Sequence, residues 1–581
     1  MVGCALARTA RAESDPAGAV PLADVSQRSV VRRPVALAEL PSRSIVCAGN
    51  RGTGSISIID TRTLALVAEY AVGESISDVA AVPGADDDLL VLDEGGDRLL
   101  RLRFEEGSPA VVDHLPVARA PVTVRMLADG ARCVVASLWG HAVTVVDLAP
   151  SPAGAMRVAA VIDLPFAPRE QAVLERHAKL VVSDAFGESF ALLDVDSWRV
   201  LSVRRLPGHN TRGLGVSRDG KRLLVAHPVL NPLAPTTAND VHWGMVITNL
   251  LRVLSLDAVV DPAGDLLAGS WYSQFPGGGN EAGDPGAIAL DSKGRVAVAL
   301  SGVAEVAIAA GPDLEFRRVA VGRRPEALLF DAAGDRVFVA NALDDTVSVV
   351  DPTGDGPTRT IALGPRPPPT PADRGERLFY DASRSLDSWY SCHSCHTDGH
   401  TNGLLNDNFG DGSYGAPKRI PSLLGVGDSG PWAWNGETES LEEQVRRSIR
   451  TTLRGRALEE GDVGDLVAVL RSLPAPPVAQ DSSPPDLRER GGEVFDEQGC
   501  DRCHTAPAFT STHAHDVGLT DAAGNRHFNP PSLRGVRWRG AYFHDAREAD
   551  LEAVFTRHAH GLDEALGLED LAALLAYLRT L

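Results

Sequence analysis

A strand–turn–strand pattern that repeats along the chain before residue 365 constrains the fold more than any other sequence feature. The copy at 45–60 has an apolar strand, a glycine-rich turn and an alternating strand that ends in Asp60. Further copies follow at a spacing of about 40–50 residues. The clear ones lie at 133–147, 179–194 and 336–351, and the weaker ones at 89–104, 223–257 and 295–309. This period is typical of propeller blades, so the pattern predicts an all-β, seven-bladed propeller.

Two proline-rich stretches divide the chain into predicted domains. Residues 365–372 and 474–486 have the composition of stiff linkers. In chain order we expect a tail or export-signal remnant at 1–33, the propeller at 34–364 with an insert at 228–251, and helical domains at 373–473 and 487–581. The insert contains His242 and Trp243, and we interpret it either as a surface excursion or as a contact with the C-terminal domains.

Two Cys-x-x-Cys-His motifs follow the first linker, at 392–396 (CHSCH) and 500–504 (CDRCH). This is the attachment pattern of haem c, in which two thiols bond to the vinyl groups and the adjacent imidazole binds the iron. The His after each pair, and the long separation of the pairs, argue against zinc and against a disulfide redox motif. We predict two covalently bound haems, with their iron, held by Cys392, Cys395, Cys500 and Cys503, with His396 and His504 as axial ligands.

Charge and the N-terminus bear on partners and location. The net charge of −21 argues against nucleic acid as a partner. The sequence contains no run of about 18 apolar residues, so it predicts no transmembrane helix. Haem c is attached outside the cytoplasmic membrane, so we expect an exported, periplasmic protein. Ala10-Arg11-Ala12 resembles a signal-peptidase site, whereas Val2-Gly3-Cys4 resembles a lipoprotein box, so a lipoprotein anchor stays open.

The region after residue 373 is an internal duplication. Segments of the first half match segments of the second, namely 421–423 with 531–533, and 434–436 with 544–546. Each half ends in an amphipathic helix, at 463–473 and at 568–581. These matches predict two tandem, mainly α-helical cytochrome c domains with one haem each.

These motifs resemble the bacterial di-haem cytochrome c peroxidases and the related MauG over residues 373–581. Besides the two haem motifs, the resemblance rests on 375–379 (GERLF), 515–518 (HDVG) and 542–545 (YFHD). The repeat at 336–351 is similar to the YVTN family of β-propeller repeats. The two resemblances imply a di-haem oxidoreductase module joined to a YVTN-like propeller.

The resemblance assigns different roles to the two haems. In the family the N-terminal haem reacts with peroxide, the C-terminal haem stores an electron, and a tryptophan lies between them. Trp434 falls at that tryptophan's position, with a core aromatic as the alternative interpretation. Gln444 matches the family's Gln over the peroxide, whereas the family's Glu falls on or near Arg454, which cannot act as a base. Glu459 or Glu460 can substitute only if the helix is offset.

The second haem departs from the family pattern in its sixth ligand. The methionines are Met1, Met126, Met156 and Met245, so the haem region has none to serve as the family's Met ligand. The corresponding position holds His558, which implies a bis-imidazole iron of lowered potential. His560 is the alternative ligand, and a solvated helical histidine is the alternative interpretation.

The first haem has few candidates for a sixth ligand. The family's displaceable distal His falls near Asp411, and His400 is too close to His396 to reach over the haem. Tyr414, or His242 from the propeller insert, could bind the iron; otherwise its sixth position is open. An open position is what chemistry on a small molecule requires.

The sequence also bears on calcium binding and on the expected activity. The family's interdomain calcium positions hold Arg419, Arg539 and Ala541, so we expect no calcium, with the arginines supplying positive charge instead. We expect a haem oxidoreductase that acts on hydrogen peroxide or an unidentified substrate and receives electrons from a small protein such as a monohaem cytochrome or cupredoxin. The alternatives are a non-catalytic electron-transfer protein whose propeller docks a redox partner, and a binding propeller with a redox tag.

Overall fold

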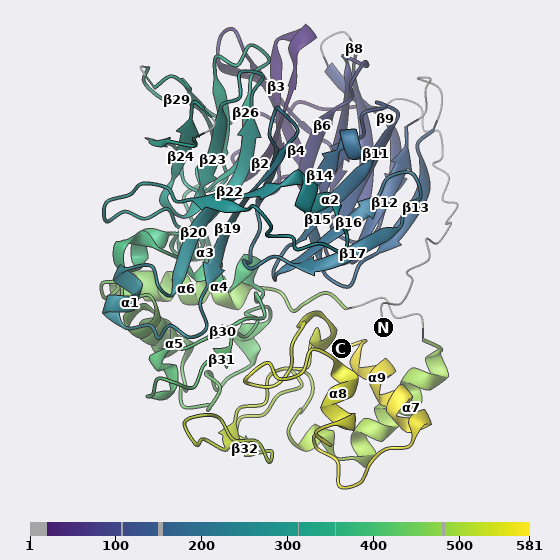
Figure 1. Cartoon of the computed structure of the whole chain (residues 1–581), viewed down its shortest axis with the longest axis vertical. Coiled ribbons are helices and arrows are strands. Elements are labelled where there is room, and N and C mark those ends of the chain that lie inside the picture. The colour runs from purple at the N-terminus through teal and green to yellow at the C-terminus, as the bar shows by residue number, and fades with distance from the viewer. Residues whose placement is uncertain (1–19, 106–107, 149–154, 312, 355, 479–482) are drawn as a thin grey trace. The chain divides into compact units, whose positions relative to one another are not determined.

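The computed structural model describes residues 20–105, 108–148, 155–311, 313–354, 356–478 and 483–581 (Figure 1). The predicted tail at 1–33 is only partly included, since the signal-like and lipoprotein-like motifs, with Cys4, lie outside the described residues. The chain forms two compact units. One comprises Met1–Val229 and Asn249–Pro368, and the other comprises Leu230–Thr248 and Pro369–Leu581.

The first unit consists of seven antiparallel sheets, each containing four consecutive strands that pair in chain order; in the second sheet, β1 (Val20–Pro21) adds a fifth strand beside β9. The first four sheets are β2 (Pro34–Leu40), β3 (Ile45–Asn50), β4 (Ser55–Asp60), β5 (Ala65–Ala71); β6 (Ile76–Ala81), β7 (Asp88–Asp93), β8 (Arg98–Glu105), β9 (Ser108–Pro116); β10 (Pro121–Met126), β11 (Arg132–Ser137), β12 (Ala142–Asp147), β13 (Arg157–Asp163); and β14 (Pro168–Leu174), β15 (Lys179–Asp184), β16 (Ser189–Asp194), β17 (Val200–Arg205). The last three are β18 (Gly213–Val216), β19 (Arg222–Leu230), β20 (Ile247–Ser255), β21 (Trp271–Ser273); β22 (Pro285–Leu290), β23 (Val296–Leu300), β24 (Glu305–Ala309), β25 (Phe316–Ala320); and β26 (Pro325–Phe330), β27 (Val337–Asn341), β28 (Thr346–Val350), β29 (Arg359–Ala362). The predicted seven-bladed propeller is therefore confirmed, and each repeat forms the two middle strands of a blade.

The ring closes between its first and last blades. Each innermost strand contacts the innermost strand of the next blade, and β26 contacts β2. Val46 and Ile59 of the first blade share a core cluster with Phe338 and Val349 of the last. The middle strands are buried because neighbouring blades cover both of their faces, which explains why their apolar runs are nearly continuous.

A buried arginine joins the start of the propeller to its end. Arg32 is 0% exposed, and its Nε donates to Glu69 Oε2 at 2.8 Å. Its Nη1 donates to the carbonyl oxygen of Pro365 at 2.8 Å, and its backbone N–H donates to Asp345 Oδ1 at 3.1 Å. A buried guanidinium with this many partners stabilises the closed ring, since losing one partner would leave an unsatisfied charge.

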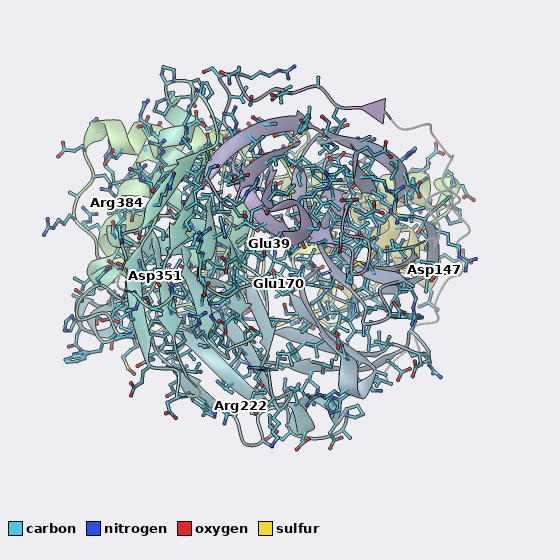
Figure 2. The ribbon with its side chains drawn as sticks, turned by 90° about the horizontal axis from the view of Figure 1, so that it is seen from above. Glu39, Asp147, Glu170, Arg222, Asp351 and Arg384 are labelled. Carbon is cyan, nitrogen blue, oxygen red and sulfur yellow. The ribbon has the colours of Figure 1, made fainter. Side chains whose placement is uncertain are left out.

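Charged side chains also link the innermost strands. Arg125 of β10 donates to Asp78 of β6 at 2.8 Å and lies 3.4 Å from Glu170 of β14. Burial raises the pKa of Glu170 although three nearby arginines oppose the shift. Glu170 lies near the middle of the view in Figure 2, whereas Asp147, at the end of the third strand of its blade, lies towards the edge.

The second unit contains two copies of one small helical domain. Its helices are α1 (Ala238–His242) in the insert, α3 (Pro371–Phe379), α4 (Cys392–Cys395), α5 (Leu441–Arg447), the π-helical turn η9 (Ser448–Thr452) and α6 (Glu460–Ser472) in the first copy, and α7 (Pro485–Glu497), η10 (Cys500–Arg502), α8 (Leu551–Thr556) and α9 (Leu568–Leu578) in the second. Short strands pair in each copy, β30 (Leu405–Asn406) with β31 (Lys418–Arg419) and β32 (His515–Asp516) with β33 (His527–Phe528). The predicted mainly helical domains after the propeller are confirmed, and α6 and α9 cover the predicted amphipathic segments.

The same glycine contact holds the first and last helix of each copy together. Helix α3 packs on α6, and α7 packs on α9. A Cβ on Gly375 would lie 1.9 Å from the carbonyl oxygen of Asp465, and a Cβ on Gly491 would lie 2.0 Å from that of Ala573. Both positions therefore need glycine because the helix backbones approach too closely for any side chain. This contact frames the haem motif that lies between the two helices of each copy.

Candidate functional site

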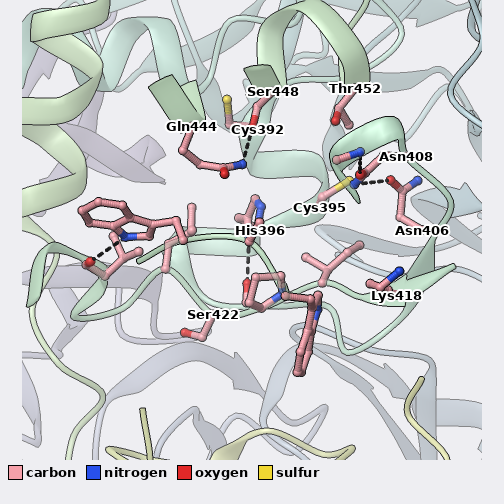
Figure 3. A pocket seen from close by; sticks show the side chains of 18 of the residues that line it. Cys392, Cys395, His396, Asn406, Asn408, Lys418, Ser422, Gln444, Ser448 and Thr452 are labelled. Carbon is pink, nitrogen blue, oxygen red and sulfur yellow. Dashed lines mark hydrogen bonds between the residues drawn. The ribbon is translucent and has the colours of Figure 1, made fainter. Parts of the chain in front are cut away.

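The first Cys-x-x-Cys-His motif opens onto a cavity of about 300 Å³. Helix α4 carries Cys392 and Cys395, and both thiols line the cavity together with His396 (Figure 3). Ser391 and Ser394 form a capping box at the start of this helix, which fixes the turn that holds the two thiols. Neither thiol is in a disulfide. The motif is therefore presented on one rigid turn at the wall of a cavity.

The imidazole of His396 is held in the tautomer that can bind a metal. Its Nδ1 lies 2.9 Å from the carbonyl oxygen of Pro421, drawn as a dashed line in Figure 3. A carbonyl only accepts hydrogen bonds, so Nδ1 carries the proton and the lone pair of Nε2 remains for a ligand. Burial lowers the pKa of His396 to about 4, which favours the neutral ring.

The second motif repeats this arrangement with a different carbonyl. Nδ1 of His504 lies 3.1 Å from the carbonyl oxygen of Phe509, and burial lowers the pKa of His504 to about 4. Cys500 packs against a core cluster that includes Phe495 and Leu574. Burial raises the pKa of the Cys500 thiol to about 11.

The residues present fit haem c. Each motif offers two thiols without a disulfide and one imidazole with a free Nε2, which are the groups that haem c attachment uses. The cavity at the first motif is largely apolar, as suits a porphyrin, and it contains buried polar atoms that have no hydrogen-bond partner. These are Asn406 Nδ2, Arg419 Nη1, Gln444 Oε1, Asn529 Oδ1 and Arg534 Nε.

Gln444 lies in this cavity, where the sequence predicted a polar group. Its Nε2 donates to Ser448 Oγ at 3.2 Å, while its Oε1 is buried without a partner. Figure 3 shows Gln444 and Ser448 on the same side of the cavity as Cys392. Ser448 begins the π-helical turn η9, which also lines the cavity; π-helical turns are frequent at functional sites.

Trp434 lies at the junction of the two copies, and its partner there is the equivalent residue of the second copy, His544. The Trp434 and His544 rings are 6.4 Å apart and edge-on. Two reciprocal backbone bonds flank the pair: Arg419 N–H donates to His544 O at 2.6 Å, and Asn529 N–H donates to Trp434 O at 2.7 Å. The Trp434 indole donates to Arg419 O at 2.7 Å. His544 is buried and stacks on Phe528 at 4.3 Å. The two copies are thus joined through matching positions, with aromatic rings between them.

The candidate sixth ligands of the first haem are engaged elsewhere. His400 Nδ1 contacts Ser422 Oγ at 2.9 Å and its Nε2 contacts the carbonyl oxygen of Trp538 at 3.1 Å. His242 Nδ1 contacts Asp387 Oδ2 at 2.6 Å. The described residues that line the cavity include neither of these histidines, nor Tyr414, nor Arg454.

The propeller insert contacts the loop and the π-helical turn beside this cavity. Thr236 is 0% exposed, its hydroxyl donates to Thr451 O at 2.8 Å, and its N–H donates to Asp407 O at 2.9 Å. Its carbonyl oxygen accepts from Arg454 Nε at 2.5 Å and from the Tyr414 hydroxyl at 3.3 Å. Of the two interpretations of the insert, the structure shows the contact with the haem unit. Nothing in the local sequence around Thr236 indicated it, apart from the helix-capping pattern Thr237–Asp240.

The two candidate ligand histidines of the second copy lie on either side of Ala559 and pack against Phe543. His558 Nε2 contacts Glu548 Oε1 at 2.8 Å, and Glu548 is itself buried. His560 lies close enough to His504 to contribute to the lowering of its pKa. Both rings pack edge-on against Phe543, at 5.0 Å for His558 and 5.6 Å for His560.

Sequence reasoning missed Lys418 and Asp411, which face each other in the cavity wall. Lys418 pairs with Asp411 of its own copy and with Asp521 of the second copy, the latter at 3.0 Å. Asp411 Oδ1 accepts from Ser413 at 3.1 Å. No periodic pattern marks these residues, since they lie on loops and on the two-residue strand β31.

Residues 370–476 match the family model of the di-haem cytochrome c peroxidases. This part of the chain is therefore similar to the di-haem cytochrome c peroxidases, and the matched segment contains the first Cys-x-x-Cys-His motif. The methylamine utilization protein MauG of Methylorubrum extorquens is 28% identical over 32% of this chain and 68% of that protein. Hydrazine synthase subunit gamma of Kuenenia stuttgartiensis is 26% identical over 36% of this chain and 76% of that protein. Cytochrome c551 peroxidase of Nitrosomonas europaea is 22% identical over 36% of this chain and 79% of that protein.

The family match at 370–476 and the similarity to MauG and to cytochrome c551 peroxidase support a haem-dependent, peroxidase-like oxidoreductase, and the matched segment follows a seven-bladed propeller in the chain. Among the described residues, no helix combines the length and the apolar character that crossing a membrane requires.

Proposed function

We propose that the haem on the first motif (Cys392–His396) reacts with peroxide or an unidentified substrate, and that the haem on the second motif (Cys500–His504) supplies its electrons. The observation that carries the proposal is the cavity that joins the first motif to Gln444. Among the described residues that line it, His396 is the one histidine and no methionine is present, so the wall offers little to close the iron. When bound, the haem supplies a redox-active iron whose sixth position can accept a small molecule.

The protein's own polar groups would bind and orient the reacting molecule. One N–H of Gln444 Nε2 donates to Ser448, and the unpartnered Oε1 can accept an O–H from a bound peroxide. An amide oxygen cannot take up a proton at neutral pH. Asp411 is the carboxylate among the described lining residues, so we assign proton uptake to Asp411, with Lys418 balancing its charge.

Trp434 would carry electrons between the copies. Its ring lies against His544 at the junction, and its indole N–H is held by Arg419 O. An aromatic ring fixed between the two haem motifs offers a path that saturated side chains do not.

A histidine is our proposal for the sixth ligand of the second haem. His558 occupies the position that the family resemblance implies, but it would have to leave Glu548 to bind the iron. His560 packs against the same Phe543 ring and is the alternative ligand. Either ligand closes the second iron, which suits a centre that stores and passes electrons.

The location and partner follow from the cofactor. Covalent attachment of haem c takes place outside the cytoplasmic membrane, so we propose a periplasmic protein that receives electrons from a small redox protein such as a monohaem cytochrome or a cupredoxin. The second candidate function is electron transfer without turnover. It is favoured by Arg454, which stands where the family has a carboxylate and is bound to Thr236 and Tyr414.

The test is peroxide turnover by the full chain, loaded with haem and supplied with a reduced monohaem cytochrome. We expect hydrogen peroxide to oxidise the donor, and Asp411→Asn to slow this by roughly a hundredfold, a typical loss for a general acid–base group. Gln444→Leu should also slow it, because the group that orients the bound peroxide is lost. Glu442→Gln is the control, because Glu442 lies on the same helix but pairs with Arg471 outside the cavity lining. Haem-loaded protein that neither consumes peroxide nor binds cyanide would establish the electron-transfer role instead.

A further inference from the structure

Arg419 is a buried cation with an unused donor. It ends β31, its side chain lies in the cavity wall, and the residue is 2% exposed. Its Nε donates to the carbonyl oxygen of Phe543 at 3.3 Å, and its guanidinium lies 5.5 Å from the centre of the Trp434 ring. Its Nη1 is buried and has no hydrogen-bond partner. The Nη1 group of Arg419 is therefore available to donate to a ligand.

A second guanidinium, that of Arg539, lines the same cavity from the other copy. Burial, together with the nearby charge of Arg539, lowers the pKa of Arg419 to about 9. Burial lowers the pKa of Arg539 to about 10. The two groups are still charged at neutral pH. Arg419 is buried and Arg539 is half-buried, and two such like charges without a counter-ion are costly, so an anion between them would stabilise the folded protein.

The other cations of this cavity each have an acidic partner. Lys418 pairs with Asp411 and Asp521, Arg447 lies 3.7 Å from Glu437, and Arg534 lies 3.6 Å from Asp428. Among the described residues, no carboxylate forms an ion pair with Arg419 or Arg539. The protein therefore neutralises every cation in this wall except these two.

We infer that Arg419 and Arg539 form a carboxylate-binding site, and that its occupant is a propionate of the haem attached to Cys392 and Cys395. A planar guanidinium binds a carboxylate through two parallel N–H···O bonds. The unpartnered Nη1 of Arg419 can donate one of them. Asn406 Nδ2 is a further buried donor in the same wall without a partner. This inference rests on the proposed haem site, because the cavity that contains the pair also contains the first motif.

The bound carboxylate would change the properties of that haem. Cations that hold a propionate offset its negative charge, so the oxidised, more positive iron is less favoured and the reduction potential rises. The same pair would fix the rotation of the macrocycle and join the two copies through one haem edge.

The test compares midpoint potentials of both haems in the full, haem-loaded chain by spectroelectrochemical titration. The variants are Arg419→Gln, Arg539→Gln and their combination, with Arg447→Gln as a control that removes the same charge from the same wall but from a paired residue. We expect the potential of the first haem to fall in both single variants and furthest in the double variant, with a smaller change in the control and in the second haem. Arg419→Lys, which keeps the charge, should restore part of the shift.

A second arm identifies the source of the carboxylate. Acetate and phosphate are titrated into wild type: a propionate occupant predicts no saturable change in potential, whereas a free anion predicts a saturable change that the double variant loses. Equal potentials in the double variant and Arg447→Gln would overturn the inference. Denatured protein without covalently bound haem would instead refute the haem site itself, so the two failures are distinguishable.

Discussion

The two copies of the haem domain share a backbone arrangement but differ in the side chains around the haem motif. Both have a glycine contact between first and last helix, and both turn through a left-handed residue at the same place, Ala433 (φ 66°) and Phe543 (φ 67°). In the first copy, Gln444 and the turn η9 line a cavity without a second histidine among its described residues. In the second copy, His558 and His560 lie beside Phe543.

This difference shows that the duplication preserves the frame while the side chains around each motif diverge. A shared fold does not fix a shared function, since the site determines the chemistry. We assign the reaction with peroxide or substrate to the first copy and electron storage to the second. Variants of each copy test this division.

Removing the thiols of one copy should have the largest effect. Cys392→Ala/Cys395→Ala should leave one covalent haem per chain, and Cys500→Ala/Cys503→Ala should leave the other, because each copy attaches its own haem. The measurement is haem per chain in denatured protein, from the pyridine haemochrome spectrum. The spectra of the two variants should differ. The haem left in Cys500→Ala/Cys503→Ala should have an open sixth position, and the haem left in Cys392→Ala/Cys395→Ala should have a closed one. Identical spectra would remove the contrast between the copies.

The sixth ligand of the second haem gives the next largest effect. Either His560→Ala or His558→Ala should convert one low-spin haem to high-spin, since an imidazole is lost from the iron. The contacts of His558 with Glu548 favour His560 as the effective variant. EPR of the oxidised protein decides between them, and low-spin iron in both variants would place the ligand elsewhere.

The glycine contact predicts equal damage to both copies. Gly375→Ala and Gly491→Ala should each destabilise by about 1–3 kcal/mol, because a Cβ would overlap a helix carbonyl. Gly492→Ala is the matched control: the nearest atom to its Cβ would be 3.6 Å away, so the gain in helix propensity, about 1 kcal/mol, should stabilise. Thermal unfolding of the three variants measures this. A loss confined to one copy would show that the frames are not equivalent.

Trp434→Phe should have the smallest and most specific effect. It should slow the equilibration of electrons between the haems after photoreduction, with both haem spectra intact. Trp432→Phe is the control, since the Trp432 indole donates to Val426 O within its own copy. Equal rates in wild type and Trp434→Phe would mean that electrons do not pass through this ring.

Local patterns were enough to predict much of the fold. The propeller followed from apolar strand pairs at a regular spacing, and the two helical copies followed from paired motifs. Cys47 and Cys133 lie in apolar strand patterns, which predict core thiols, and both are 0% exposed.

Contacts between distant residues could not be predicted in this way. The bond from Thr236 to Thr451 joins segments far apart in the chain, and the pairing of Lys418 with Asp411 and Asp521 joins loops that have no periodic pattern. The partner of His558, Glu548, likewise depends on how a hairpin folds back. Such contacts depend on tertiary packing, so local sequence leaves them undetermined.

The measurement that tests the central claim most directly is EPR of the fully oxidised, haem-loaded protein before and after addition of cyanide. The account predicts one high-spin and one low-spin ferric haem per chain. Cyanide should convert only the high-spin signal, and that signal should be absent from Cys392→Ala/Cys395→Ala. Two low-spin haems that cyanide leaves unchanged would contradict the division between an open first copy and a closed second copy.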